Sequence, residues 1–193
     1  MKKLMVAVAA VAMAAASYAA QIDWSVASGA WKLQDGTAAA SGTTVYLIDF
    51  SQKTSIISAL SADDFEYTEA NISKVAGVIG KSTTNDSAGN VAKNTVNNLP
   101  ASYVAGTTKY GWGYLVVETQ ANGDVYADIA GSVSKAVYDP LDAKYSTPQQ
   151  ASFTDRQAMD YTKVHTGGDV PEPTSAMLML LGMAGLALRR RRA

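Results

Sequence analysis

Short runs in which apolar and polar residues alternate make up most of the chain, and clusters of Ser, Thr, Gly, Asn and Asp separate them. Alternation with a period of two is typical of strands that bury one face, and the intervening residues are typical of turns. The longest such run covers residues 109–138. We predict further strands at residues 22–27, 44–50 and 74–81, weaker ones at 102–107 and 151–153, and a segment at 30–33 that pairs with the first.

The run at 109–138 is predicted to form a hairpin, because Asn122-Gly123 is a strong signal for a two-residue type I′ turn. Such a turn pairs Val116 with Ile129, which sets the register of the whole hairpin. The apolar face that carries Trp112 is predicted to lie in the core, since a slip of one residue would turn it to water. In this register the same face also carries Tyr114, Val116, Val125, Ala127, Ile129 and Val133.

Two short helices are predicted, at residues 53–60 and 90–98. The first follows Ser51, which suits an N-cap, and the second ends before Pro100, which suits a helix stop. Together these elements predict a mainly β fold, either a β-sandwich or an open Greek-key barrel with one or two short helices. The β-rich domain is expected to span residues 20–138, and residues 139–169 are expected to be a polar irregular segment or stalk.

The first 19 residues have the three parts of a secretory signal peptide. Two lysines precede an apolar run at 4–16, which is expected to be helical, and the small residues Ser17 and Ala19 follow it. We expect signal peptidase to cut after Ala19, because a cut after Ala20 would put the bulky Tyr18 in a position that needs a small residue. The protein is therefore expected to be exported.

The last 24 residues form a second three-part segment, residues 170–193. Pro171, Glu172 and Pro173 are held extended by the two prolines, a shape that a protease cleft accepts. An apolar stretch at 176–188 follows, which as a helix is about 20 Å long and therefore short for a bilayer. The basic cluster Arg189, Arg190, Arg191 and Arg192 ends it and is expected to stop transfer and stay in the cytoplasm.

This order of motif, short hydrophobic helix and arginine cluster resembles the PEP-CTERM sorting domain of Gram-negative bacteria. The resemblance covers about 24 of the 193 residues. It implies recognition by an exosortase, a membrane enzyme that resembles a transpeptidase, after transient anchoring in the inner membrane through the C-terminal helix. It also implies delivery to the cell surface or extracellular matrix, often in cells that make exopolysaccharide.

Removing both terminal segments changes the charge of the chain. Of 16 basic residues, 10 remain between residues 20 and 170, together with 16 of the 17 acids, so the net charge falls to about −6. An acidic surface argues against nucleic acid and anionic lipid as partners. The chain has no cysteine, so its exported domain must be held together by its core alone.

Residues that could carry out catalysis or bind metal are few. The single histidine, His165, falls in the expected stalk, and with no cysteine or GxSxG motif there is no visible nucleophile. Carboxylates bunch at 63–66 and 139–142, where calcium is an alternative to ordinary surface acids. A pair of acids of the glycosidase type stays open, although nothing in the sequence selects one. We therefore expect no enzyme activity, no cofactor and no metal.

Exposed aromatic side chains would point instead to a glycan ligand, because sugar faces stack on flat rings. Trp24 and Trp112 lie in alternating strands and are expected in the core, whereas Trp31 follows Ser28-Gly29-Ala30 and is the preferred stacking candidate, with Tyr110 as another. The leading expectation is a non-catalytic structural protein of the cell surface or matrix. A carbohydrate-binding or adhesive module is the alternative, and a secreted glycan hydrolase is a remote one.

Overall fold

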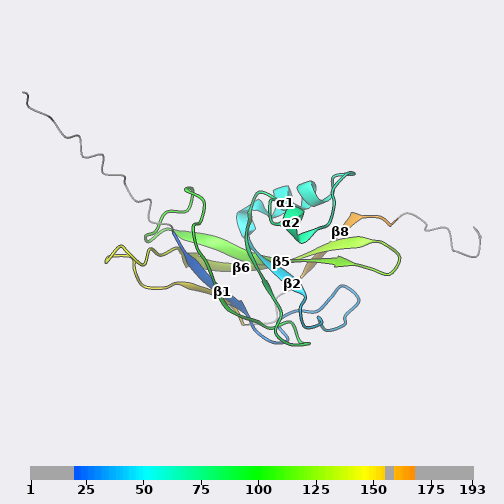
Figure 1. Ribbon diagram of the computed structural model, residues 1–193, viewed down its shortest axis with the longest axis horizontal. Helices are drawn as coiled ribbons and strands as arrows, with labels where there is room; N and C mark the ends of the chain where they lie inside the picture. The colour runs from blue at the N-terminus through cyan, green and yellow to red at the C-terminus, as the bar shows by residue number, and fades with distance from the viewer. Residues whose placement is uncertain (1–19, 155–158, 168–193) are drawn as a thin grey trace, which may run out of the picture.

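The computed structural model describes residues 20–154 and 159–167, and most of this part of the chain is built around two β-sheets (Figure 1). In the larger sheet the order is β3-β2-β5-β6-β8, and in the smaller it is β4-β1-β7. The strands of the larger sheet are β2 (Thr44–Asp49), β3 (Val78–Thr83), β5 (Lys109–Thr119), β6 (Val125–Ala136) and β8 (Asp160–His165). Those of the smaller sheet are β1 (Ile22–Val26), β4 (Val91–Val96) and β7 (Gln150–Phe153). The expectation of a mainly β fold is confirmed.

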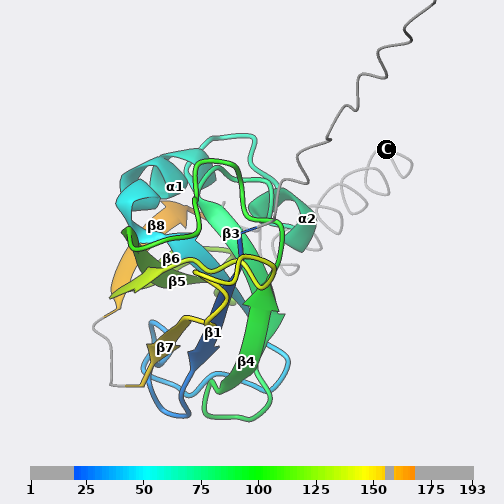
Figure 2. The same ribbon diagram turned by 90° about the vertical axis from the view of Figure 1, so that its left-hand side faces the viewer.

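The elements stack in three layers, with the helices on one face of the larger sheet and the smaller sheet on the other (Figure 2). One apolar cluster, with Trp24, Trp112 and Phe153 among its members, fills the space between the two sheets. A second cluster joins the outer face of the larger sheet to the helices, for example through Leu115 and Ile56. Two packed sheets agree with the sandwich form of the prediction.

The helical elements are short and follow the ends of strands. The 3-10 helix η1 (Phe50–Gln52) and α1 (Lys53–Leu60) come directly after β2, and α1 has the bounds that the sequence predicted. Asp49 caps η1, because its side chain accepts a hydrogen bond from the Ser51 amide. The four-residue helix α2 (Glu69–Ile72) was not predicted and is capped by Thr68.

The β5–β6 hairpin is present, but its predicted register is wrong over most of its length. Val116 pairs with Asp128, not Ile129, because the connection runs from residue 120 to 124, and the amide of Gln120 donates to the carbonyl of Asp124. The hydrogen bond between Gln120 and Asp124 closes a loop of three residues, 121–123, and the extra residue relative to a two-residue turn shifts the pairing by one. A bulge at Trp112 and Gly113 restores the predicted pair of Trp112 and Val133.

The register shift also moves side chains to the other face of the sheet. Val125, Ala127 and Ile129 pack under the helices, and they do not share the face of Trp112 and Tyr114 between the two sheets. Both faces of the hairpin are therefore buried, although the sequence pattern predicted one apolar and one mixed face.

Other predictions about local structure are corrected as well. Residues 90–98 contain the strand β4 and not a helix, because pairing with β1 outweighs the weak local helix signal. Residues 30–33 and 102–107 form no strand. In contrast, the predicted strands at 22–27, 44–50 and 151–153 are confirmed as β1, β2 and β7, and the one at 74–81 only in its second half as β3.

The expected stalk also contributes to the fold. β7 pairs in parallel with β1, and β8 pairs with β6 in the larger sheet, so residues 150–153 and 160–165 belong to the β-rich fold. The sequence concealed this because pairing between strands that are far apart in the chain, parallel for β7 and antiparallel for β8, leaves no local signal. The expected signal helix and C-terminal hydrophobic helix lie outside the described residues. Among the helices of the described part, none is long and apolar enough to cross a bilayer.

Candidate functional site

A cavity of about 520 Å³ opens where the end of β2 meets two loops. One loop connects α2 to β3, and the other precedes β5. The residues that line the cavity, here called the cleft, are Asp49, Gln52, 73–79, Pro100, Ser102, Tyr103 and Tyr110. Its volume lies within the range of known small-ligand sites.

Two tyrosine rings line the cleft, and the buried Trp112 supports them from behind. Tyr103 stacks on the buried Trp112, with 5.5 Å between ring centroids and 30° between ring planes. Tyr110 meets Tyr103 edge-on at 5.0 Å, and its hydroxyl accepts a hydrogen bond from the amide of Val104 at 3.0 Å. Tyr103 is only 8% exposed, whereas Tyr110 is half-buried. Tyr110 is therefore the aromatic ring with the larger accessible surface in the cleft.

A partly exposed carboxylate lies beside these rings. Oδ2 of Asp49 accepts a hydrogen bond from the Tyr103 hydroxyl at 2.6 Å, while Oδ1 accepts from the amide and hydroxyl of Ser51 at 2.9 and 2.6 Å. Burial and then the Asp49 carboxylate raise the pKa of Tyr103 far above its usual value. The tyrosine hydroxyl thus stays protonated and continues to donate to Asp49 at any physiological pH.

The opposite wall depends on a glycine that closely approaches η1. Gly77 has a φ of +92°, and its carbonyl accepts a hydrogen bond from the Asp49 amide at 2.8 Å. A Cβ at this position would lie 2.6 Å from Cβ of Gln52. Only glycine combines this backbone conformation with so short a distance, so Gly77 lets the loop before β3 pack this closely against η1.

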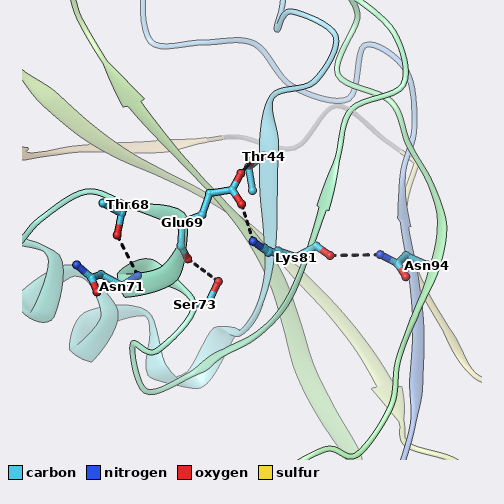
Figure 3. A network of polar contacts seen from close by, with 7 residues as sticks. All are labelled: Thr44, Thr68, Glu69, Asn71, Ser73, Lys81 and Asn94. Atoms are coloured by element: carbon cyan, nitrogen blue, oxygen red, sulfur yellow. Dashed lines mark hydrogen bonds and ion pairs between the residues drawn. The ribbon is translucent and has the colours of Figure 1, made fainter.

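A polar network fastens α2, and with it the start of that wall, to the sheet (Figure 3). The Glu69 carboxylate binds the Lys81 ammonium of β3 and accepts a hydrogen bond from Thr44 of β2. The hydroxyl of Ser73, which lines the cleft, donates to the Glu69 carbonyl at 2.7 Å. In the same network the Asn94 side chain of β4 donates to the Lys81 carbonyl, which links the two sheets. The cleft wall is therefore tied to both sheets.

Trp31, the preferred stacking candidate from the sequence, does not lie at the surface. It is 2% exposed, and its indole nitrogen donates to the carbonyl of the buried Gly89 at 3.0 Å. Gly89, in the turn before β4, lies directly against the indole, so the expectation of a stacking role for Trp31 is wrong. Trp24 and Trp112 are fully buried, as predicted.

His165 lies on β8, where its exposed side chain is 5.9 Å from the ring of Tyr67. Asp139 and Asp142 cap turns by accepting hydrogen bonds from the amides of Leu141 and Lys144. Within residues 20–154 and 159–167, no group of three or more His, Asp or Glu side chains has the arrangement of a metal site. These side chains have local structural contacts.

The terminal residues singled out from the sequence lie outside the described part of the chain: Ala19, Pro171, Glu172, Pro173 and Arg189, Arg190, Arg191 and Arg192. For the C-terminal ones a comparison with known families is decisive, because the model of the PEP-CTERM protein-sorting motif matches residues 169–192. The chain carries a PEP-CTERM sorting motif. This motif indicates an exported protein that is sorted through its C-terminal segment, and it implies processing by an exosortase-like enzyme.

The PEP-CTERM motif accounts for the tail and includes none of the cleft residues. No curated protein and no solved structure matches the chain. The cleft was also missed by sequence reasoning, except for Tyr110, which was named as an aromatic candidate. Asp49 and Tyr103 are 54 positions apart and meet only because the loop before β5 folds onto the end of β2. No local pattern predicts that contact.

Proposed function

We propose that this chain is a non-catalytic protein of the cell surface or extracellular matrix, delivered there through its PEP-CTERM motif. The observation that carries the proposal is the match of the sorting-motif model to residues 169–192. A protein of this kind is exported, held briefly in the inner membrane of a Gram-negative bacterium by its C-terminal hydrophobic segment, and then processed. Signal peptidase removes residues 1–19, and the exosortase-like enzyme acts near Pro171, Glu172 and Pro173.

The chemistry of the cleft supports a non-catalytic role over a glycan hydrolase. Glycosidases of the common mechanisms use two carboxyl groups that flank the scissile bond. Among the described residues that line the cleft, Asp49 is the only acid, and it already accepts hydrogen bonds from Ser51 and Tyr103. Such a carboxylate is suited to hold a ligand hydroxyl.

A second candidate function is that of a carbohydrate-binding or adhesive module. The specific observation in its favour is the accessible ring of Tyr110 beside the Asp49 carboxylate in a cleft of about 520 Å³. Flat rings next to a few polar groups are the usual composition of sites that bind sugars and other small ligands. The same protein could serve as a matrix component and bind exopolysaccharide through this cleft.

The sorting proposal is tested by the intact mass of the protein isolated from its own host, with its cell fraction recorded. We expect a mass that lacks the N-terminal 19 or so residues and everything beyond the Pro-Glu-Pro region, in the surface or extracellular fraction. Excess mass would identify a covalent attachment. A mass that retains the arginine cluster, in the membrane fraction, would overturn the proposal.

Variants link the processing to the motif. Pro171→Ala or Glu172→Ala is expected to leave the domain folded and to block the C-terminal cut, so that the precursor accumulates in the membrane. Pro148→Ala is a matched control, because it changes a proline outside the motif and is expected to be processed normally. Normal maturation of both motif variants would contradict the assigned role of residues 171–173.

A further inference from the structure

We infer that the cleft binds a neutral hexopyranose unit of a polysaccharide, with one sugar face on Tyr110 and one hydroxyl on Asp49. This inference rests on the carbohydrate-binding role proposed above and names its site and ligand class. A pyranose ring has a face of C–H groups and an edge of hydroxyls. A site for it therefore needs a flat apolar surface with hydrogen-bonding groups beside that surface.

The apolar surface is the ring of Tyr110. Its neighbours hold it in place, because Tyr103 contacts it edge-on at 5.0 Å and Trp112 lies 6.1 Å away. The Tyr110 hydroxyl is tied to the loop by the hydrogen bond from the Val104 amide. The ring is therefore positioned before a ligand arrives, which lowers the entropy cost of stacking.

The hydrogen-bonding edge begins with Asp49. A carboxylate has about four acceptor positions, and three of those on Asp49 are occupied by the two groups of Ser51 and the hydroxyl of Tyr103. The remaining acceptor position on Oδ2 suits one donated hydroxyl proton. A sugar hydroxyl can fill it while its own oxygen accepts from another group.

Side chains at the rim of the cleft can donate hydrogen bonds to the hydroxyl oxygens of the sugar. Gln52 and Lys74 both line the cleft with exposed side chains, an amide and an ammonium. Neighbouring hydroxyls of a sugar both donate and accept, so one carboxylate with two donors complements them. The negative charge of Asp49 and the positive charge of Lys74 balance within the cleft. The net charge of about −6 on residues 20–170 repels acidic polymers, which favours a neutral sugar over a uronate.

A proline-rich peptide is the other ligand that aromatic grooves recognise. Such peptides dock between successive exposed rings. Here Tyr103 is 8% exposed and Trp112 is fully buried, so only the half-buried Tyr110 among these three rings offers appreciable surface to a ligand. One platform beside a carboxylate fits a sugar better than a polyproline helix.

The test is calorimetric titration of the protein isolated from its own host. The probes are soluble oligosaccharides of glucose, mannose and N-acetylglucosamine, with oligogalacturonate and a proline-rich peptide as comparison ligands, each at up to about 1 mM. We expect at least one neutral oligosaccharide to bind. Tyr110→Ala should weaken that binding at least about tenfold, and Gln52→Ala should weaken it less.

A matched control separates the site from general effects of losing a tyrosine. Tyr126 is also half-buried in the same sheet, but it lies in β6 near the far end of the hairpin, paired with Glu118. Tyr126→Ala is expected to bind as the unmodified protein does. If Tyr110→Ala does not fold, as judged by its thermal transition, the exposed Gln52→Ala variant still reports on the cleft.

The outcomes distinguish this inference from the functions on which it rests. Oligosaccharide binding that survives both Tyr110→Ala and Gln52→Ala would overturn the site but keep the carbohydrate-binding role. Binding of the oligogalacturonate or of the peptide alone would overturn the ligand class. No binding of any oligosaccharide would overturn both the inference and the carbohydrate-binding role, while the sorting proposal, tested by mass, would stand.

Discussion

Replacing Trp112 with alanine tests both the core and the support of the cleft. Trp112 is fully buried between the two sheets, and its indole nitrogen donates to the Lys135 carbonyl at 3.0 Å. Its ring also stacks on Tyr103, which carries the hydroxyl that binds Asp49. The substitution therefore opens a large cavity, removes the indole donor from the Lys135 carbonyl and removes the surface on which Tyr103 rests.

The expected cost follows from these three losses. Truncation of a buried Trp or Phe to Ala costs about 3–5 kcal/mol, including the cavity that remains. The lost aromatic pair is worth about 0.5–1.5 kcal/mol beyond its buried area, and the orphaned carbonyl adds about 1 kcal/mol where water cannot reach it. The range of about 3–5 kcal/mol already includes part of the lost ring contact and hydrogen bond, so we expect Trp112→Ala to lower the free energy of unfolding by about 4 kcal/mol. That is a large share of the roughly 5–15 kcal/mol typical for a domain.

The free energy of unfolding is measured by urea denaturation, followed by circular dichroism. We expect a lower midpoint with an unchanged m-value, which assigns the change to stability and not to the compactness of the unfolded chain. Trp112→Phe is the control, because it keeps a ring against Tyr103 and should lose only about half as much. A loss below about 1 kcal/mol for Trp112→Ala, as for a surface position, would refute the placement of Trp112 between the sheets.

Three further substitutions test other parts of the fold. The Asp23 side chain is 2% exposed, and this burial alone would raise its pKa. Hydrogen bonds from Lys93 and from the hydroxyls of Thr95 and Tyr138 outweigh burial and hold the pKa below the usual value. Because the pKa is lower in the folded state, the charged carboxylate stabilises the fold at pH values above the unfolded pKa of about 4, and this stabilisation is lost as the pH falls through the folded-state pKa. Asp23→Asn should therefore cost about 3 kcal/mol at pH 7, and in urea titrations the difference from the unmodified protein should narrow below about pH 4. Gly77→Ala should lower stability by about 2 kcal/mol or more, whereas Gly36→Ala, with φ +82° but open space around it, should cost less; equal losses in thermal melts would remove the steric argument. Trp31→Phe should cost about 1–3 kcal/mol through its lost buried hydrogen bond and leave oligosaccharide binding unchanged; weakened binding would return Trp31 to the ligand site.

The hairpin illustrates how far pattern alone carries a prediction. The alternation at residues 109–138 correctly indicated two paired strands and the burial of Trp112. It did not decide the register, because Asn122-Gly123 suits both a two-residue turn and the three-residue loop, 121–123, that forms. Gly123 takes its positive φ of +83° in that longer loop. One extra residue on one side reverses which face each β6 side chain occupies, and only packing against the helices and the smaller sheet selects between the registers.

The sequence by itself determined the mainly β character, α1, the buried Trp24 and Trp112, and the PEP-CTERM motif at 169–192, because each depends on residues that are neighbours in the chain. Tertiary structure alone decided that 91–96 forms a strand, that β7 and β8 join the sheets, and that Asp49, Tyr103 and Tyr110 share one cleft. Strand pairing and side-chain contact across long separations are chosen by the free energy of burying the whole core. That free energy is a property of the folded chain, and no short segment of sequence contains it.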